Sequence, residues 1–207
     1  MAREVAEYLL EIKAVVLNPS EPFTWASGMK SPIYCDNRKT LSYPKVRNFI
    51  KTAFAEIITD EFCTCELIAG VATAGIPHGA LVADVLTLPF VYVRDKAKAH
   101  GLENLIEGKL ESGQKVIVIE DLISTGGSSL KAIEALRRAG AEVLGLAAIF
   151  TYAFPESSRN FEAAKCPFFT LSDYPTLIEV AHQQDYIKDS EKIVLLDWYR
   201  NPVGWNA

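Results

Sequence analysis

VIVIEDLISTGGSS, which spans residues 116–129, is the stretch that decides the fold of this chain. It opens with four β-branched residues, Val116 to Ile119, which predict a short central strand of a parallel sheet. Glu120 and Asp121 follow at the carboxyl end of that strand, and ligands bind at this edge of open α/β sheets. A buried strand rarely ends in paired carboxylates without a ligand for them to hold, so a binding site is expected here.

The turn and the helix that follow this strand suit a phosphate group. Gly126 and Gly127 allow positive φ angles and a close approach of the backbone to a ligand. The apolar spacing predicts a helix over residues 128–139 with a glycine stop at Gly140. Free amides at its N-terminus, together with neighbouring hydroxyls, would bind a phosphate dianion. Those hydroxyls belong to Ser124, Thr125, Ser128 and Ser129.

The two acids further limit the class of ligand that could bind at this site. Carboxylates repel phosphate, but they accept hydrogen bonds from sugar hydroxyls or act through a metal ion. The predicted ligand is therefore a phosphorylated sugar. A P-loop is excluded because no Gly-Lys-Ser/Thr follows, and a Rossmann fingerprint is excluded because no G-x-G-x-x-G follows the strand. An ordinary strand–turn–helix with a polar loop is the alternative.

From residue 45 onward the chain alternates helix and strand, which predicts a parallel sheet with right-handed crossovers. The predicted helices cover residues 44–62, 76–86, 128–139, 155–164, 174–182 and 187–200. The predicted strands cover residues 66–70, 89–93, 115–119, 142–150 and 167–171. Residues 1–43 do not fit this rhythm, because a helix is followed by prolines and short extended pieces. They are expected to form a small cap over the carboxyl edge of the sheet.

Length and composition are those of an ordinary globular domain. Its 207 residues, 49% of them hydrophobic, are expected to form one α/β domain with a small appendage. The net charge of −5 argues against a nucleic-acid surface. The first helix is amphipathic and unlike a signal peptide, and no apolar run approaches the roughly 18 residues of a membrane span. The four cysteines lack zinc-site spacing and are expected to be reduced, buried thiols of a cytosolic protein.

Basic residues gather directly after the predicted strand over residues 89–93. Arg94, Lys96, Lys98 and His100 fall within seven residues. Residues 102–112 have no clear period, and a structureless segment of this length in a compact domain is usually a functional lid. The predicted lid lies near residues 95–112, where its charge suits pyrophosphate and its closure would exclude water. A solvated basic loop is the alternative. It is disfavoured because the segment should lie at the same edge of the sheet as Glu120 and Asp121.

Residues 116–129 resemble the phosphoribosyl pyrophosphate (PRPP) motif of type I phosphoribosyltransferases. The resemblance implies the α/β fold of that family, a central parallel sheet flanked by helices with an N-terminal hood. It implies a cap over residues 1–43 that contributes to the base site and a core over residues 44–207. It further implies that Glu120 and Asp121 hold the ribose hydroxyls and that the next loop wraps the 5′-phosphate. This loop consists of Leu122, Ile123, Ser124, Thr125, Gly126, Gly127 and Ser128.

The basic segment resembles the catalytic lid of orotate phosphoribosyltransferases. Arg94, Lys98 and His100 match the lid residues that contact pyrophosphate and act in catalysis in that family. Lys96 lies one place away from a lysine that some members carry, and it joins the implied PRPP-binding set. Residues 70–77 resemble the pyrophosphate loop of the family, for which the resemblance implies main-chain contacts only.

The cap stretch GMKSPIYCD, residues 28–36, resembles the Lys-Ser-Pro segment of the same family. The resemblance implies that Lys30 contacts orotate or PRPP and that Tyr34, with Cys35, flanks the flat pyrimidine. Ser124 stands where the family places a hydroxyl against orotate. Some members hold the base with an arginine after the next strand, but this chain has TYAFP at residues 151–155. Main-chain amides of the cap are an alternative partner for the orotate carboxylate.

The resemblance implies transfer of the 5-phosphoribosyl group from PRPP to orotate, giving orotidine 5′-monophosphate and pyrophosphate in pyrimidine biosynthesis. It implies Mg²⁺ bound mainly through PRPP, a homodimer whose lids are shared between subunits, and no nucleic-acid or membrane partner. A purine-base phosphoribosyltransferase and a non-catalytic PRPP-binding regulator are the alternatives. The Lys30 segment and the basic lid speak against the first, and no basic patch supports the second. His78 and His182 are expected to be packing or surface residues.

Overall fold

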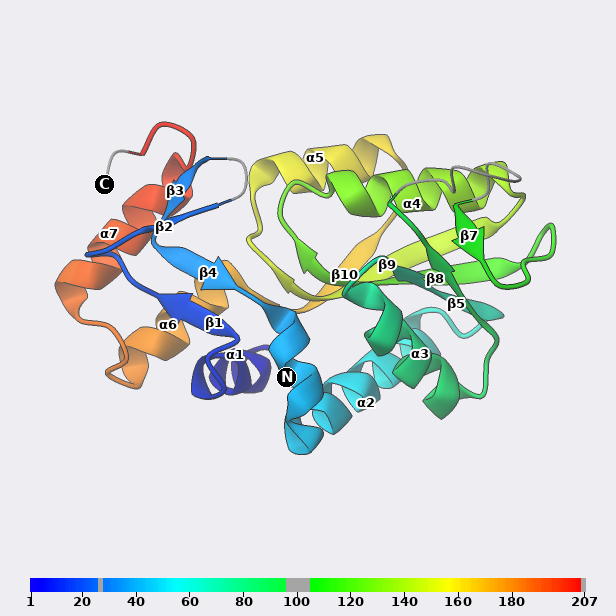
Figure 1. The fold of residues 1–207 in the computed structure, drawn as a ribbon, viewed down its shortest axis with the longest axis horizontal. Coiled ribbons are helices and arrows are strands. Elements are labelled where there is room, and N and C mark those ends of the chain that lie inside the picture. Colours follow the sequence, from blue (N-terminus) through cyan, green and yellow to red (C-terminus); the bar gives the residue numbers. More distant parts are fainter. Residues whose placement is uncertain (26–27, 96–104, 206–207) are drawn as a thin grey trace.

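The computed structural model describes residues 1–25, 28–95 and 105–205, and a six-stranded sheet lies at its centre (Figure 1). In sheet order the strands are β10 (Phe168–Asp173), β9 (Glu142–Thr151), β8 (Lys115–Ile123), β5 (Leu67–Val71), β6 (Phe90–Val93) and β7 (Ile106–Glu107). Neighbouring strands pair in parallel, except that β7 is antiparallel to β6. The prediction of a parallel α/β sheet flanked by helices is confirmed.

Alternate residues of the central strands enter two hydrophobic cores, one on each face of the sheet. Ile117 and Ile119 of β8 belong to one core, and Val116 and Val118 belong to the other. The first core includes α1 (Ala2–Glu11), α2 (Pro44–Glu61), α3 (Gly75–Leu86), α6 (Tyr174–Gln183) and α7 (Asp189–Arg200). The second includes α4 (Gly127–Arg138) and α5 (Pro155–Ala163), which lie across the sheet from α2 and α3 in Figure 1. A sheet covered on both faces requires the continuous apolar runs seen in the sequence.

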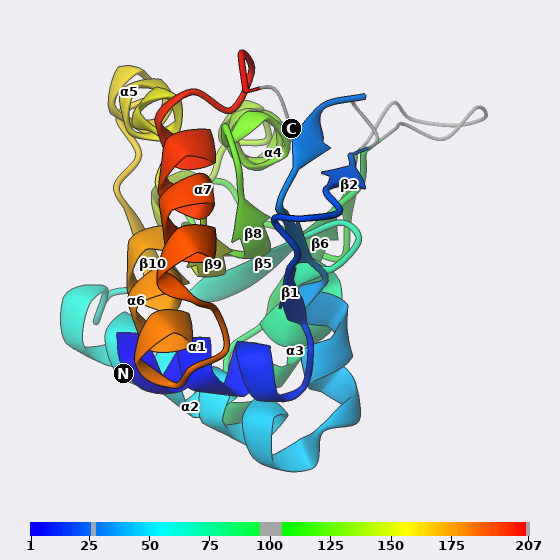
Figure 2. The same ribbon diagram turned by 90° about the vertical axis from the view of Figure 1, so that its left-hand side faces the viewer.

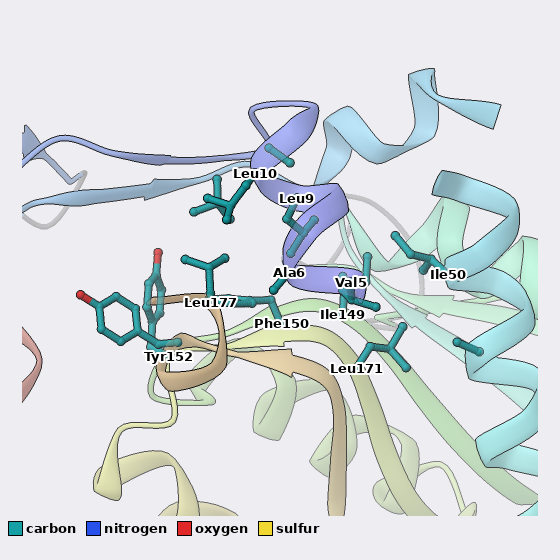
Figure 3. Packing of buried hydrophobic residues seen from close by; sticks show 14 of the residues in the cluster. Val5, Ala6, Leu9, Leu10, Ile50, Ile149, Phe150, Tyr152, Leu171 and Leu177 are labelled. Atoms are coloured by element: carbon teal, nitrogen blue, oxygen red, sulfur yellow. The ribbon is translucent and has the colours of Figure 1, made fainter. Parts of the chain in front are cut away.

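The first helix packs into the main core. Val5 and Leu9 of α1 are fully buried, and Figure 3 shows them near Leu177 of α6 and the ends of the central strands. The Ser172 hydroxyl of β10 donates a hydrogen bond to the Ala2 carbonyl at 2.9 Å. Helix α1 is therefore held by the sheet and by α6. Within the described part of the chain, no helix is both long and apolar enough to cross a membrane.

The segment between α1 and α2 forms a cap of short strands (Figure 2). Strand β1 (Val15–Leu17) pairs antiparallel with β4 (Ile33–Cys35), and β2 (Phe23–Thr24) pairs antiparallel with β3 (Lys30–Ser31). The 3₁₀ helix η1 (Asn37–Ser42) then leads into α2. The Trp198 Nε1 of α7 donates to the Lys30 carbonyl at 3.3 Å. The C-terminal helix thus supports the cap hairpin.

Two predictions differ from the structure by more than shifts of one or two residues at the ends of elements. Strand β8 does not end at Ile119 but continues to Ile123, because β9 runs beside it as far as the pair Ile123–Thr151. The prediction that residues 102–112 lack secondary structure is wrong for Ile106–Glu107, which pair with β6. Ile106 is buried in the second core, and a strand of this length is too short to show a period in the sequence.

The cysteines are free thiols, but they are not all buried. Cys166 is buried, whereas Cys35 and Cys65 are half-buried. The prediction of burial is wrong for Cys63, which is exposed in the turn between α2 and β5. Because Cys63 lies outside both elements, its side chain does not face a hydrophobic core.

Helix α3 lies close to the sheet because glycines occupy the contact. A Cβ atom on Gly70 of β5 would lie 2.8 Å from the Gly75 carbonyl oxygen. A Cβ atom on Gly75 would overlap the Ile119 carbonyl oxygen of β8 and approach the Glu120 Cα to 3.4 Å. Because backbone atoms form both sides, neither side can move away alone. This contact holds the loop before α3 beside the acidic end of β8.

We expect Gly75→Ala to lower the free energy of unfolding by about 3 kcal/mol, because the added methyl group would force two backbones apart. Gly127→Ala is the matched control, since its Cβ would have only Thr125 Oγ1 nearby, at 3.9 Å. Urea unfolding of both variants and the unmodified protein measures the difference. Equal stability of the two variants would contradict the close packing of α3 on β8.

Candidate active site

The carboxyl ends of β5, β6 and β8 meet at one edge of the sheet. They carry, respectively, the loop over residues 72–74, Arg94, and the acidic and glycine-rich segment over residues 120–128. Parallel strands place their carboxyl ends at a common edge, where open α/β sheets bind ligands. The structure therefore brings together the segments that the sequence marked separately.

The two acids at the end of β8 are held by hydrogen bonds. Glu120 is 4% exposed, and its Oε2 accepts a hydrogen bond from the Ser129 hydroxyl of α4 at 3.0 Å. Its Oε1 accepts from the Asp121 amide at 3.1 Å. Burial and then the charge of Asp121 raise the pKa of Glu120 well above its usual range, and burial also raises the pKa of Asp121. The pair thus resists full ionisation, which weakens its repulsion of a nearby phosphate.

The turn after β8 forms the start of α4. Gly126 has φ +86°, and a Cβ atom there would lie 2.6 Å from Phe161 Cε2, so this position requires glycine. The Asn160 side chain of α5 donates to the Thr125 carbonyl at 3.0 Å and holds the turn from outside. The amides of the first turn of a helix have no partner within the helix and attract anions. The turn over residues 124–128, which we call the cradle, therefore has a geometry that suits a phosphate at the end of the strand.

A pocket of about 280 Å³ lies between the cap and the end of β8. Its lining residues are Thr24, Trp25, Tyr34, Cys35, Leu122, Ser124 and Tyr152. Tyr34, Cys35 and Ser124, which the sequence assigned to a base site, thus share one wall. Lys30 lies at the margin of this pocket, where its Nζ donates to the Thr24 hydroxyl at 2.9 Å. A largely apolar cleft with a few hydroxyls suits a flat heterocycle.

Two aromatic residues of this pocket were not assigned to the site from the sequence. Trp25 and Tyr152 lie with ring centroids 5.1 Å apart, and Trp25 Nε1 donates to the Ile33 carbonyl at 3.1 Å. Trp25 belongs to the cap and Tyr152 follows β9, so no local pattern links them. The one available signal was that Tyr152 stands in the TYAFP stretch where some relatives place an arginine.

Arg94 lies at the end of β6 beside a second, larger cavity of about 480 Å³. The cavity also has Ser128 of the cradle and Lys131 of α4 in its wall. Arg94 Nη1 lies 3.3 Å from Glu107 Oε1 of β7, an ion pair that is partly open to solvent. The cradle and the first basic residue of the lid therefore border one cavity. Lys96, Lys98 and His100 lie outside the described residues.

In the described ranges, no group of three or more His, Cys, Asp or Glu side chains could hold a metal ion. Glu120 and Asp121 offer acceptor oxygens only, which suit a hard cation that keeps most of its bonds to water and substrate oxygens. The donor set thus fits Mg²⁺ carried by a phosphorylated ligand and does not form a closed cage.

His78 of α3 belongs to a buried polar chain behind the acids. It is 1% exposed, and its Nε2 lies 3.4 Å from the Thr40 hydroxyl of η1. That hydroxyl donates its one hydrogen to the Asn37 carbonyl at 2.6 Å, so His78 Nε2 is the donor toward Thr40. Burial lowers the pKa of His78 to about 4, which agrees with a neutral ring. His182 is partly exposed and pairs with Asp189 at 2.7 Å, so both histidines have the packing or surface places expected.

Comparison with known proteins assigns this arrangement to a class. The phosphoribosyl transferase domain family matches residues 41–189, which include the acids, the cradle and the sheet. The chain therefore has the fold of a phosphoribosyltransferase. It is 56% identical over 207 residues to the orotate phosphoribosyltransferase of Bacteroides thetaiotaomicron, covering 100% of this chain and 98% of the relative. It is 59% identical over 203 residues to that of Listeria innocua, covering 98% and 97%. The chain belongs to the orotate phosphoribosyltransferase family.

Solved structures agree with this assignment. The orotate phosphoribosyltransferase of Aeropyrum pernix superposes with a TM-score of 0.77 at 26% identity and covers 89% of this chain and 99% of its own. The UMP synthase of Leishmania donovani has a TM-score of 0.82 at 25% identity and covers 96% of this chain but 42% of its own length. The second comparison matches this chain to one part of a larger protein.

The buried His78 should make stability depend on pH. Its lowered pKa means that the folded protein favours the neutral ring, whereas the unfolded chain binds a proton near pH 6.5. The stabilisation is complete above that pH and is lost as the pH falls from 6.5 toward 4, by as much as about 3 kcal/mol. His78→Gln, which keeps a donor toward Thr40, should flatten this dependence in urea unfolding at several pH values. Parallel curves for the two proteins would contradict the assignment, because Glu120 titrates equally in both.

Proposed function

We propose that this chain transfers the 5-phosphoribosyl group from PRPP to orotate and forms orotidine 5′-monophosphate and pyrophosphate, a step of pyrimidine (UMP) biosynthesis. Family membership supports this reaction. The observation that carries it is the place of Ser124, which lines the pocket under the cap and begins the phosphate cradle of residues 124–128. One loop thereby adjoins both a site for a flat base and a site for a sugar phosphate.

The acids would hold the ribose while the bond at C1 changes. Orotate N1 attacks C1 as pyrophosphate leaves, so positive charge grows on the ribose ring in the transition state. Glu120 and Asp121 would accept hydrogen bonds from the ribose hydroxyls. These hydrogen bonds and the cation would favour the ionised carboxylates, which burial disfavours in the protein without ligand. Residues Leu122 to Ser128 would bind the 5′-phosphate and fix the distance between C1 and the base. Catalysis then rests on positioning and on charge stabilisation.

Cationic side chains of the basic segment after β6 would stabilise the leaving pyrophosphate. Arg94 would take this role, which its position beside Ser128 in the wall of one cavity supports. Lys96, Lys98 and His100, which lie outside the described residues, complete the proposed set, with Lys98, Arg94 and His100 as the catalytic residues. Backbone groups of the loop before α3 would add main-chain contacts.

Orotate would lie in the pocket of about 280 Å³ under the cap. Tyr34 would flank the pyrimidine ring, and Ser124 would contact its edge. Lys30, bonded to Thr24 at the pocket margin, would place a positive charge near the orotate carboxylate. The aromatic wall of Trp25 and Tyr152 favours a planar base.

The proposal includes Mg²⁺, which would neutralise pyrophosphate charge while bound mainly through PRPP oxygens. It includes a homodimer in which the lid of one subunit completes the site of its neighbour. It also includes a cytoplasmic location, which suits cysteines that are free thiols. The division into a cap over residues 1–43 and a core over residues 44–207 is part of the same proposal.

The reaction can be tested by following the absorbance of orotate after addition of PRPP and Mg²⁺. We expect orotate to be consumed and orotidine 5′-monophosphate to appear. Adenine, guanine and hypoxanthine are the control bases, and they should not be consumed. Turnover of a purine without orotate loss would indicate a purine enzyme, and PRPP binding without any turnover would indicate a regulator.

Lid sharing can be tested by mixing two inactive variants. Lys98→Ala removes a lid cation, and the double variant E120Q/D121N disables the ribose site. If the lid acts on the neighbouring subunit, a co-expressed equal mixture should recover about a quarter of the unmodified activity, because half the dimers are mixed and each has one complete site. No recovery in proven mixed dimers would mean that each lid serves its own subunit. Each variant co-expressed with itself is the control.

A further inference from the structure

We propose that Asn37 is a positioning residue that holds the ribose-binding end of β8 and the thiol wall of the base pocket in one arrangement. This inference rests on the proposed transfer to orotate. Asn37 is fully buried at the start of η1. Its Nδ2 donates to the Asp121 carbonyl at 2.7 Å, and its Oδ1 accepts from the Cys35 thiol at 3.4 Å. The two ends of a single amide group therefore contact the two halves of the site.

The Asp121 carbonyl needs this partner because of the sheet geometry. The ladder between β5 and β8 ends at the pair Gly70–Ile119, so the acidic end of β8 extends past its neighbour on that side. Asn37 supplies a hydrogen bond beyond the point where β5 stops. An unpaired carbonyl buried there would cost free energy and would leave the main chain of Asp121 free to shift. The Asn37 amide thus provides the hydrogen bond that a neighbouring strand would otherwise donate to β8, at the point where the ribose would bind.

The orientation of the Asn37 amide follows from its partners. A main-chain carbonyl only accepts hydrogen bonds, so the NH₂ end must face Asp121. The thiol of Cys35 faces the oxygen end, where it acts as a donor. Burial, followed by the charges of Asp121 and Asp36, raises the pKa of Cys35, which keeps the thiol protonated for this role. Because Cys35 also lines the base pocket, a displaced Asn37 would disturb that wall too.

Asn37 is itself held from behind. The Thr40 hydroxyl donates to the Asn37 carbonyl at 2.6 Å, and neutral His78 donates to Thr40 from α3. Helix α3 begins directly after the loop over residues 72–74, at the same sheet edge. The chain His78–Thr40–Asn37–Asp121 therefore connects the helix behind the pyrophosphate loop to the ribose site through the cap. None of the first three side chains belongs to the proposed substrate-binding set.

The first test uses Asn37→Ala and Asn37→Asp, with Asn18→Asp as the control for the same chemical change elsewhere in the cap. Asn18 accepts hydrogen bonds through its side-chain oxygen from the Ser20 hydroxyl and the Glu21 amide, which a carboxylate preserves. Both Asn37 variants should lose about tenfold or more in kcat, with a raised KM for orotate, and Asn37→Asp should lose more because an acceptor then faces the Asp121 carbonyl. Asn18→Asp should stay within about twofold of the unmodified enzyme.

The kinetics are measured well below the melting temperature of each variant, so that a purely structural role would lower stability and leave kcat and both KM values unchanged. Folded Asn37→Ala with kinetic constants within about twofold of the unmodified enzyme would overturn the inference. Failure of the unmodified enzyme to consume orotate would instead overturn the proposed function.

A second pair of variants, at Thr40, tests the role of Asn37 if the Asn37 variants do not fold. Thr40→Val keeps the shape of the side chain but removes the donor to the Asn37 carbonyl, whereas Thr40→Ser keeps the hydroxyl. We expect Thr40→Val to lower kcat by about threefold to tenfold and Thr40→Ser to restore most of that loss. Thr40→Val with unchanged kcat and unchanged KM for orotate would overturn the inference.

Discussion

The site depends on the end of β8, which extends beyond one of its two neighbouring strands. The ladder with β5 stops at Ile119, while β9 continues alongside. The acidic segment is thus held by a strand on one side and by side chains on the other. Asn37 bonds the Asp121 carbonyl, and Ser129 bonds the Glu120 carboxylate. The geometry of the proposed ribose site therefore relies on the cap and on α4 as well as on the sheet.

Charge is arranged so that an acidic chain can bind an anionic ligand. The net charge is −5, and two carboxylates lie next to the cradle. Their burial raises the pKa of both acids and so limits the negative charge that a phosphate meets. Arg94 is paired with Glu107 in a partly open ion pair, and such pairs are worth only about 0–1 kcal/mol. Arg94 would therefore lose little free energy on exchanging Glu107 for pyrophosphate oxygens. Its positive charge would then lie beside the leaving group.

The parts of the site that follow from local sequence were predictable. The apolar run before Glu120, the glycine turn and the basic residues after β6 each carry a pattern within one segment. Trp25 and Tyr152 could not be paired from the sequence, because their contact joins the cap to the end of β9. The extension of β8 was missed because it depends on β9, and β7 was missed because two residues show no period. The role proposed for Asn37 likewise needs the distance to Asp121, which no spacing along the chain reveals.

The base pocket combines residues of the cap, which the C-terminal helix supports, with residues 122, 124 and 152, whereas the cradle comes from the middle of the chain alone. Trp25 of the cap packs edge-on against Trp198 of α7, with centroids 5.9 Å apart, and Trp198 also bonds the Lys30 carbonyl. The C-terminal helix thereby holds the hairpin that carries Lys30 and Trp25. The cradle, in contrast, lies in the turn between β8 and α4 and is held by α5. Changes in the hairpin or in α7 are therefore expected to alter base choice first, whereas changes at Asn37 of the cap would also reach the acidic end of β8.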